Sequence, residues 1–301
     1  MKIISIFFYL IIQACYVEAS QITPNVSTNE IALSEGVPFD DLSIIVFSCD
    51  KYQELWSPFF EMLFKSWPSL KTTNAQIPIY LVANAKKYDD PRVITVNNKN
   101  EKSWSDNALA VLASVKTKYV WIILEDYFFT RIDEKRLLEI FNFVKSEDVA
   151  YCQVAYDHVD KLVRKNHEVH SGIAEKDRYE PWRTSLFPCI WRTKDMAHTL
   201  KSGESIWEFE IPGTQRSQGL YGKFLTVFEN QPVEYLNMVQ MGYLNSQNFE
   251  SVINMGISFK RGKLEFDSDH KLFLWYDRTL KPFLYYVIWT PVKNFIKKYL
   301  F

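Results

Sequence analysis

Two adjacent carboxylates, Glu125 and Asp126, directly follow an apolar and aromatic run over 119–124. Carboxylate oxygens are hard ligands that suit Mg²⁺ or Mn²⁺, and such a cation commonly completes its shell with water and substrate phosphates. The residue types therefore predict a divalent-metal site that grips a phosphorylated substrate. A strand that simply ends in a solvated acidic turn is the alternative that the spacing leaves open.

A second group of acids lies later in the chain, where three glutamates alternate with two aromatic residues: Glu204, Trp207, Glu208, Phe209 and Glu210. On a helix, Glu204 and Glu208 would share a face, where like charges repel. Burial beside Trp207 can raise the pKa of a carboxyl group, which suits a residue that accepts a proton. An exposed acidic helix is the alternative.

The apolar run before Glu125 must form a strand of the central sheet if the two acids are to lie at a ligand-binding edge. It is rich in β-branched and aromatic side chains, which is typical of a strand buried on both faces of a parallel sheet. Ligands of open α/β sheets bind outside the carboxyl ends of the strands. Glu125 and Asp126 would lie at such an end, and Ser48 and Asp50 follow a similar run in the same way.

Strand and helix patterns alternate along the rest of the chain. Buried strand patterns occur over 42–47, 77–82, 93–96, 119–124, 151–156, 184–191, 225–228 and 233–236, and helical spacing occurs over 51–66, 132–144 and 195–200. Pro58 indicates a helix start near that residue, and Ser105 or Asp106 can cap a further helix. This alternation predicts βαβ units and a mostly parallel sheet flanked by helices, so the predicted fold class is α/β.

Composition excludes several classes of protein. The net charge of −1 lacks the basic excess of a nucleic-acid binder, so no nucleic acid is expected as a partner. The four cysteines include no CxxC pair, which argues against a zinc knuckle or a thioredoxin-like site. No GxxxxGK[ST] or GxGxxG sequence follows a strand, which argues against a P-loop or a dinucleotide site.

The two ends of the chain differ from the globular part, which we expect over 41–270. Residues 1–20 combine a basic start with an apolar run and small residues near Ala19, as in a signal peptide or a short membrane anchor. Residues 21–40 are polar and predict a linker. Residues 271–301 form a basic, aromatic, amphipathic tail, which suits either a membrane surface or packing on the domain. These two ends predict membrane association or export through the secretory pathway. They leave open on which side of the membrane the protein lies.

Several short motifs occur together within 42–210. They are Ser48-Cys49-Asp50-Lys51-Tyr52, Leu55-Trp56, Pro58-Phe59-Phe60, Trp67-Pro68, Trp104-Ser105-Asp106 and Leu124-Glu125-Asp126-Tyr127-Phe128. Together they resemble the motifs of bacterial GT-A-type glycosyltransferases of surface-polysaccharide synthesis. The resemblance implies a GT-A-like, Rossmann-type sheet and an inverting, metal-assisted enzyme. Such an enzyme moves a sugar from a nucleoside-diphosphate sugar to a hydroxyl of a glycan or lipid-linked acceptor.

The resemblance also implies roles for the nucleotide-binding and metal-binding residues. Asp50, with Ser48 beside it, matches a contact to the base or ribose, and Asp106 matches a second nucleotide contact. Glu125 and Asp126 match the acidic motif that holds Mn²⁺ or Mg²⁺ on the diphosphate. The chain has Glu-Asp where the motif has Asp-x-Asp, so which acid binds the metal directly stays open.

On the acceptor side, Glu208 is similar in position to the base of inverting enzymes, with Glu204 and Glu210 as rivals. Trp104, Trp182 and Trp207 are candidates for stacking on a sugar or base. Two other functions stay open. A nucleotidyltransferase would use paired acids and a metal on a similar sheet, and a secreted carbohydrate-binding module would keep the aromatic residues without catalysis.

Overall fold

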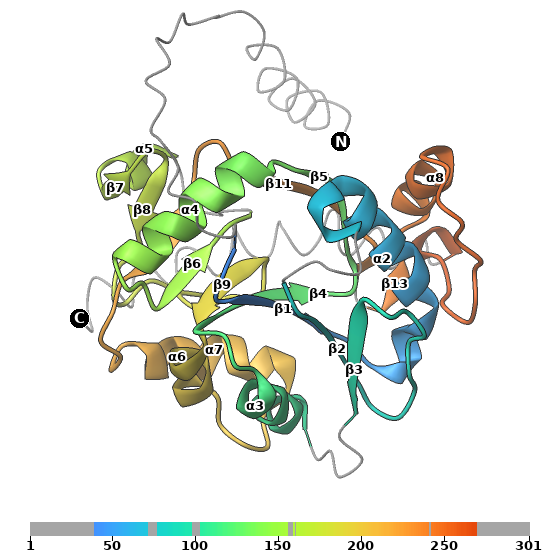
Figure 1. Cartoon of the computed structure of the whole chain (residues 1–301), viewed down its shortest axis with the longest axis horizontal. Helices are drawn as coiled ribbons and strands as arrows, with labels where there is room; N and C mark the ends of the chain where they lie inside the picture. Colours follow the sequence, from blue (N-terminus) through green and yellow to red (C-terminus); the bar gives the residue numbers. More distant parts are fainter. Residues whose placement is uncertain are drawn as a thin grey trace, which may run out of the picture. The chain divides into compact units, whose positions relative to one another are not determined.

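A nine-stranded mixed sheet forms the centre of the protein in the computed structural model (Figure 1), which describes residues 39–71, 77–97, 103–155, 159, 161–240 and 242–269. The strands are β1 (Leu42–Phe47), β2 (Ile79–Ala83), β3 (Val93–Asn97), β4 (Tyr119–Leu124), β5 (Tyr127–Ile132), β6 (Tyr151–Gln153), β7 (Glu168–His170), β8 (Ile173–Glu175), β9 (Cys189–Arg192), β10 (Phe224–Val227), β11 (Val233–Asn237), β12 (Val239–Gln240) and β13 (Tyr243–Leu244). The order in the large sheet is β3-β2-β1-β4-β9-β6-β10-β8-β7. Strands β9 and β8 run against the direction that the others in this sheet share. The predicted α/β class with a mostly parallel sheet is confirmed.

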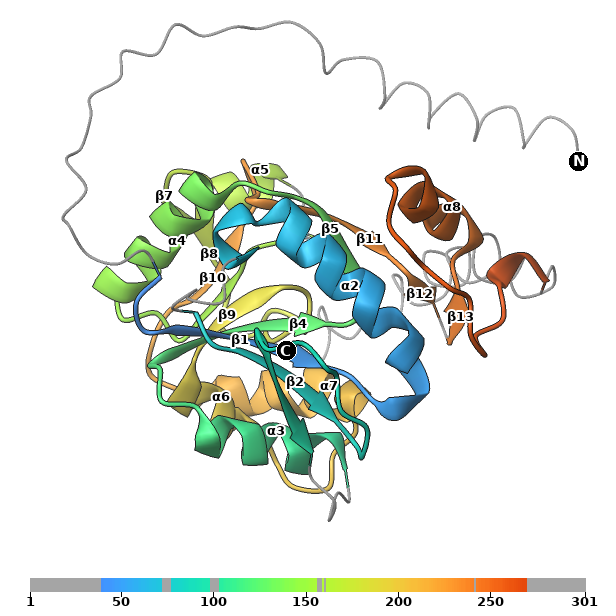
Figure 2. The same cartoon turned by 45° about the vertical axis from the view of Figure 1, so that its right-hand side comes forward.

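Helices cover both faces of this sheet, which makes three layers (Figures 1 and 2). The helices are α2 (Gln53–Ser66), α3 (Trp104–Ser114), α4 (Glu134–Ser146), α5 (Lys161–Lys165), α6 (Thr193–Thr199), α7 (Ile206–Ser217) and α8 (Ser246–Asn254), with short 3-10 turns at Asp50–Tyr52, Pro68–Lys71 and Asp267–Asp269. Helices α2 and α4 contribute to the core on one face, and α3, α6 and α7 contribute to the core on the other.

The alternation of side chains along β1 explains the two cores. Ile44 and Val46 join the core under α2 and α4, whereas Ile45 and Phe47 join the core under α3, α6 and α7. Successive strand residues point to opposite faces, so a strand buried on both sides must be apolar throughout. All six residues of β1 are buried, as the continuous apolar run predicts.

Two predicted helix starts are wrong. Helix α2 begins at Gln53, and Pro58 lies inside it. A proline removes one hydrogen bond of the helix, but the ring of Pro58 is buried with the neighbouring Phe59 and Phe60, so packing on the sheet retains the helix. Helix α3 is capped by neither of the predicted residues. Its N-cap is Ser103, whose hydroxyl accepts a hydrogen bond from the backbone of Asp106.

Strand β5 directly follows β4 but belongs to a different sheet. The sequence patterns did not separate it from the preceding run, yet it pairs with β11 in a sheet of its own. Glu125 and Asp126 are therefore the two residues of a tight turn between a strand of the central sheet and a strand of the smaller one.

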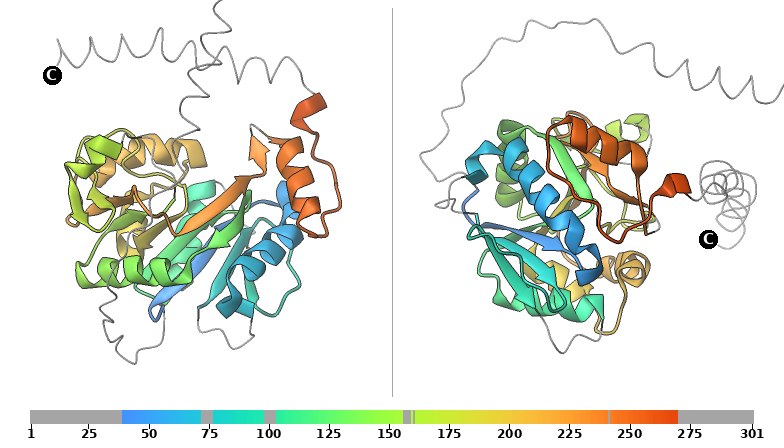
Figure 3. Two further views of the ribbon diagram at one scale, coloured as in Figure 1. Left: turned by 90° about the horizontal axis from the view of Figure 1, so that it is seen from above. Right: turned by 90° about the vertical axis from the view of Figure 1, so that its right-hand side faces the viewer.

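The segment that follows β11 packs beside α2 (Figure 3). Lys65 donates a hydrogen bond to the carbonyl of Met255 at 2.8 Å, and the backbone of Leu264 donates one to Glu54 at 2.8 Å. The predicted leader over 1–20, nearly all of the linker over 21–40 and the tail over 271–301 lie outside the described residues. Within the described part of the chain, no helix is both long and apolar enough to cross a membrane.

Candidate active site

The parallel register of β1 and β4 places their carboxyl ends side by side. Phe47 pairs with Leu124, and the next backbone amide, that of Glu125, donates to the carbonyl of Phe47 at 3.3 Å. Ser48 therefore lies next to Glu125, and its hydroxyl accepts a hydrogen bond from the Trp56 indole at 2.6 Å. Two of the predicted site residues meet here because of strand pairing alone.

The acidic pair is shielded from water and carries no counter-ion among the described residues. Glu125 is 7% exposed. Burial raises the pKa of Glu125 well above its ordinary value, and the Asp126 carboxylate raises it further. Burial also raises the pKa of Asp126 to about 7. The Oδ1 atom of Asp126 is buried and accepts no hydrogen bond from a described residue.

These features fit a divalent cation. Two neighbouring carboxylates in a dry site repel one another unless a proton or a cation neutralises them. A buried carboxylate oxygen without a donor is also costly unless an ion or a ligand binds it. Within the described residues, no group of three or more His, Cys, Asp or Glu side chains forms a complete metal site. A cation held here by Glu125 and Asp126 would take its remaining ligands from water and substrate, as Mg²⁺ commonly does.

Asp50 joins the loop after β1 to the loop after β2. Its two carboxylate oxygens accept hydrogen bonds from the backbone amides of Ala85 and Lys86, at 3.1–3.3 Å. Its own amide donates to the side chain of Asn84 at 2.9 Å. This residue holds the loops at the carboxyl edge of the sheet, and its predicted contact with a nucleotide stays a prediction.

Asp106 lies where the starts of α3 and α7 meet. Its carboxylate accepts hydrogen bonds from the hydroxyls of Ser103, at 2.8 Å, and Ser202, at 2.6 Å. Beside it, Trp104 packs between Phe47 of β1 and Phe209 of α7, with ring centroids 5.1 and 5.3 Å away. Trp104 thus packs the start of α3 against the end of β1, while the predicted role of Asp106 in nucleotide binding stays a prediction.

The predicted base, Glu208, lies in a different environment from the one expected. Ser205 is the N-cap of α7, and it forms a capping box with Glu208, whose carboxylate accepts from the Ser205 amide at 2.7 Å. These hydrogen bonds lower the pKa of Glu208, which is exposed. Glu204 precedes the helix and pairs with Arg216 at 2.6 Å, so the predicted shared face with Glu208 is wrong.

Glu210 has the properties that were expected of Glu208. Burial raises the pKa of Glu210, while the Leu186 amide, the Ser185 hydroxyl and Lys176 oppose that rise. The Oε1 atom accepts from the Leu186 amide at 2.9 Å and from the Ser185 hydroxyl at 3.4 Å. No described residue donates to Oε2. One carboxylate oxygen is thus fixed, and the other is available to a substrate.

Strand β9 brings the partners of Glu210 to the same edge of the sheet as the acidic pair. Cys189, the first residue of β9, pairs with Ile122 of β4, and β9 runs opposite to β4. The segment that leads into β9, which includes Ser185 and Leu186, therefore lies at the carboxyl end of β4. The Tyr127 phenol is within electrostatic reach of both acidic groups, since its pKa is raised by burial and then by Asp126, Tyr235 and Glu210.

The three candidate tryptophans have different surroundings. Trp104 packs in the core as described above, Trp182 is 38% exposed and Trp207 is 76% exposed. Trp207 and Ile211, which is 62% exposed, lie one turn apart on α7, on either side of Glu210 in the sequence. Open surface hollows of about 380 and 500 Å³ lie elsewhere, lined by Arg131, Arg136 and Asn230 and by Leu112, Arg192 and Ala197.

The sequence did hold one signal that separates Glu208 from Glu210. Ser205 and Glu208 have the S-x-x-E spacing of a capping box, which predicts a carboxylate bound to the helix start. No comparable signal identifies Ser185, Leu186 or Lys176 as neighbours of Glu210, because they are distant in the sequence.

Comparison with known proteins gives similarity in fold only. No protein-family model and no curated protein sequence matches the chain. A solved structure of S. aureus TarS 1-349 in complex with UDP-GlcNAc is similar over 71% of this chain and 64% of that chain, at 12% identity and a TM-score of 0.44. A longer S. aureus TarS structure is similar over 71% of this chain and 38% of that chain, at 11% identity and a TM-score of 0.42. The bifunctional IspDF from Campylobacter jejuni is similar over 66% and 52% of the two chains, at 10% identity and a TM-score of 0.38.

These similarities define neither a family nor a function for this chain. The chain also spans less than two thirds of the length of the TarS chains that it matches. The residues at the carboxyl edge of the sheet are therefore the features that bear on function.

Proposed function

We propose that the protein is a glycosyltransferase that moves a sugar from a nucleoside-diphosphate sugar to a hydroxyl of a glycan or lipid-linked acceptor. The observation that carries the proposal is the acidic pair at the carboxyl end of β4, buried Glu125 and half-buried Asp126, which has no counter-ion among the described residues and a buried Asp126 Oδ1 without a donor. The half-buried Glu210 lies on the same edge of the sheet. One group suits a cation that binds a diphosphate, and the other suits acceptance of a proton.

Glu125 and Asp126 would hold a Mg²⁺ or Mn²⁺ ion, which supplies positive charge for the leaving diphosphate. Glu210 replaces Glu208 as the proposed base. Its Oε2 would take the proton of the acceptor hydroxyl while that oxygen bonds to the anomeric carbon and the bond from that carbon to the diphosphate breaks. Attack from the side opposite the leaving group inverts the anomeric carbon.

The exposed face of α7 is the proposed acceptor side. Trp207 offers an aromatic surface for the apolar face of a sugar ring, and Ile211 extends this surface by one turn. Trp207 and Glu210 are three residues apart on this helix and are therefore neighbours on its surface, so a sugar on Trp207 would be close to the proposed base. Asp50, Ser48 and Asp106 remain the proposed contacts on the nucleotide side.

Calorimetric titration tests the binding part of the proposal. UDP, GDP and their sugars, UDP-N-acetylglucosamine among them, are titrated with and without Mn²⁺ into the wild-type chain and into Asp126→Asn. We expect at least one nucleotide to bind about tenfold or more tightly with Mn²⁺, and we expect the variant to lose that gain. The exposed Glu250→Gln on α8 is the matched control and should behave as the wild type.

The outcomes separate the proposal from its rivals. Equal binding by Asp126→Asn in the presence of Mn²⁺ would refute the assignment of the acidic pair. Binding of a nucleoside triphosphate with release of pyrophosphate would indicate a nucleotidyltransferase. Binding of a glycan without any nucleotide would indicate a carbohydrate-binding module.

A further inference from the structure

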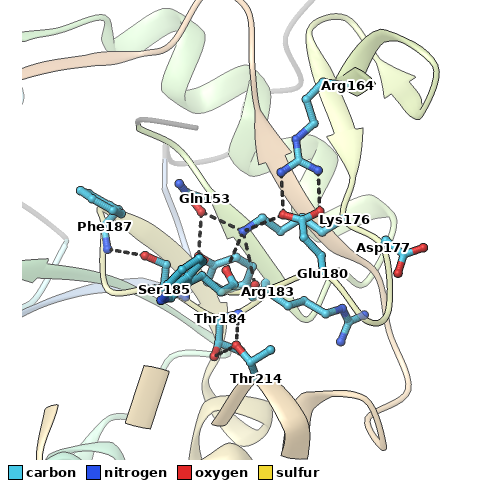
Figure 4. A network of polar contacts seen from close by, with 12 residues as sticks. Gln153, Arg164, Lys176, Asp177, Glu180, Arg183, Thr184, Ser185, Phe187 and Thr214 are labelled. Carbon is cyan, nitrogen blue, oxygen red and sulfur yellow. Dashed lines mark hydrogen bonds and ion pairs between the residues drawn. The ribbon is translucent and has the colours of Figure 1, made fainter. Parts of the chain in front are cut away.

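Lys176 is a lysine whose side chain is fully shielded from solvent. Its ammonium group donates to the side-chain oxygen of Gln153 at 3.0 Å and to the backbone carbonyls of Trp182 at 3.1 Å and Arg183 at 3.4 Å (Figure 4). A buried lysine is costly unless its charge and its donors are satisfied. The carbonyl partners belong to the segment that precedes Ser185 and Leu186, so Lys176 fixes the start of that segment.

A second set of hydrogen bonds continues from Gln153 to Glu210. The Tyr151 hydroxyl lies 3.3 Å from the Gln153 side-chain oxygen and 3.3 Å from the Ser185 backbone oxygen and nitrogen. The Ser185 hydroxyl donates to Glu210 at 3.4 Å. The same hydroxyl accepts a hydrogen bond from the Phe187 amide at 3.2 Å (Figure 4). The donors that fix Glu210 thus rest on a buried chain of polar contacts that ends at Lys176.

Glu180 and Arg164 are charged neighbours of Lys176 within the described residues. Glu180 lies 3.9 Å from the Lys176 ammonium, but both of its oxygens are occupied at 2.7 Å by the Arg164 guanidinium. Lys176 also opposes the rise in the pKa of Glu210 that burial causes.

Other titratable groups face Glu210 as well. Tyr127 of β5, Tyr151 of β6 and Cys189 of β9 all lie within its electrostatic reach, and burial raises the pKa of each of the three. These phenols and this thiol are neutral near pH 7. Lys176 is therefore the charged group among those that face Glu210 in the described structure.

We propose that Lys176 is a positioning residue for Glu210: through Gln153, Tyr151 and the 182–186 segment it holds the donors that orient this carboxylate, and its charge favours the ionised form. The role of Glu210 as a base rests on the proposed function, whereas the link between Lys176 and Glu210 does not. A base must be ionised before it can accept a proton, so the link has a direct chemical consequence.

The test compares the titration of Glu210 in the wild type, Lys176→Gln and Lys176→Met. The chain is labelled with ¹³C at the glutamate carboxyl carbons, and the Glu210 signal is identified by its absence from Glu210→Gln. Glutamine keeps a donor without the charge, and methionine removes both. We expect the midpoint of the Glu210 titration to rise by about one pH unit in both variants, which is a tenfold change in the proton-binding equilibrium. Lys165→Met, at an exposed position on α5, is the matched control and should leave it unchanged.

A kinetic readout accompanies the titration. The acidic limb of the pH profile of kcat/KM for sugar transfer should move upward with the Glu210 titration, with a loss of about tenfold below the midpoint and little loss above pH 8. Loss of folding alone would lower kcat/KM at all pH values equally.

Tyr151→Phe keeps the test decisive if the lysine variants fail to fold. This substitution removes one hydroxyl from the chain of contacts and should also raise the midpoint of the Glu210 titration. An unchanged Glu210 titration in every folded variant overturns the proposal. A wild type that transfers no sugar overturns the proposed function, and the titration still decides the role of Lys176.

Discussion

Replacement of Glu210 by glutamine separates the chemistry of this residue from its place in the structure. Glutamine keeps a side-chain oxygen at the Oε1 position, where it can still accept hydrogen bonds from the Leu186 amide and the Ser185 hydroxyl. The other terminal atom becomes a nitrogen, which cannot accept a proton. The substitution therefore removes the basic oxygen and leaves the packing intact.

The size of the effect follows from this geometry. A positioned general base contributes about 10²–10⁴-fold to a rate, which corresponds to about 3–5 kcal/mol in activation free energy. We expect Glu210→Gln to lose that factor in kcat, with the affinity for the donor within about threefold of the wild type. The variant should unfold at the same or a higher temperature, because burial raises the pKa of Glu210 and so disfavours its ionised form in the folded state.

The assay measures release of the nucleoside diphosphate with donor and acceptor present, and calorimetry measures donor binding separately. Glu208→Gln is the matched control on the same helix. It should lower the unfolding temperature slightly through the capping box and leave kcat within about threefold. A greater loss of kcat in Glu208→Gln than in Glu210→Gln would refute the assignment of the base.

Two further predictions concern stability. Lys118 and Arg192 lower the pKa of Asp148 from 3.8 to about 2, so its ionised form stabilises the fold above about pH 4, and this contribution disappears as the pH falls toward 2. The stability difference between the wild type and Asp148→Asn, measured by urea unfolding, should therefore shrink from pH 6 to pH 2, and a constant difference would contradict this. Arg164→Met removes the close partner of Glu180 and leaves the more distant Lys176 ammonium at 3.9 Å, so it should cost about 3 kcal/mol in the free energy of unfolding, whereas Arg164→Met with Glu180→Gln should recover part of that loss. A loss below about 1 kcal/mol would show that the pair contributes little.

Sequence patterns predicted strands correctly where both faces are buried, and they predicted wrong helix boundaries where packing competes with local preference. The run before Glu125 had to be a central strand, because it is apolar throughout. Pro58 suggested a later start for α2, yet the packing of Phe59 and Phe60 retains the longer helix. Strand β5 was not separated from the run before it, because its pairing with β11 joins residues about a hundred positions apart.

The candidate site also combines features that local sequence predicts with features that depend on packing between distant segments. Neighbouring residues are enough to predict that Glu125 and Asp126 follow a buried strand and that three glutamates occur close together near the start of α7. Contacts between distant segments leave Glu210 half-buried, pair Glu204 with Arg216 and place Lys176 against the segment that holds Glu210. Burial and charge pairing depend on which distant segments the sheet brings together, and strand register sets that arrangement.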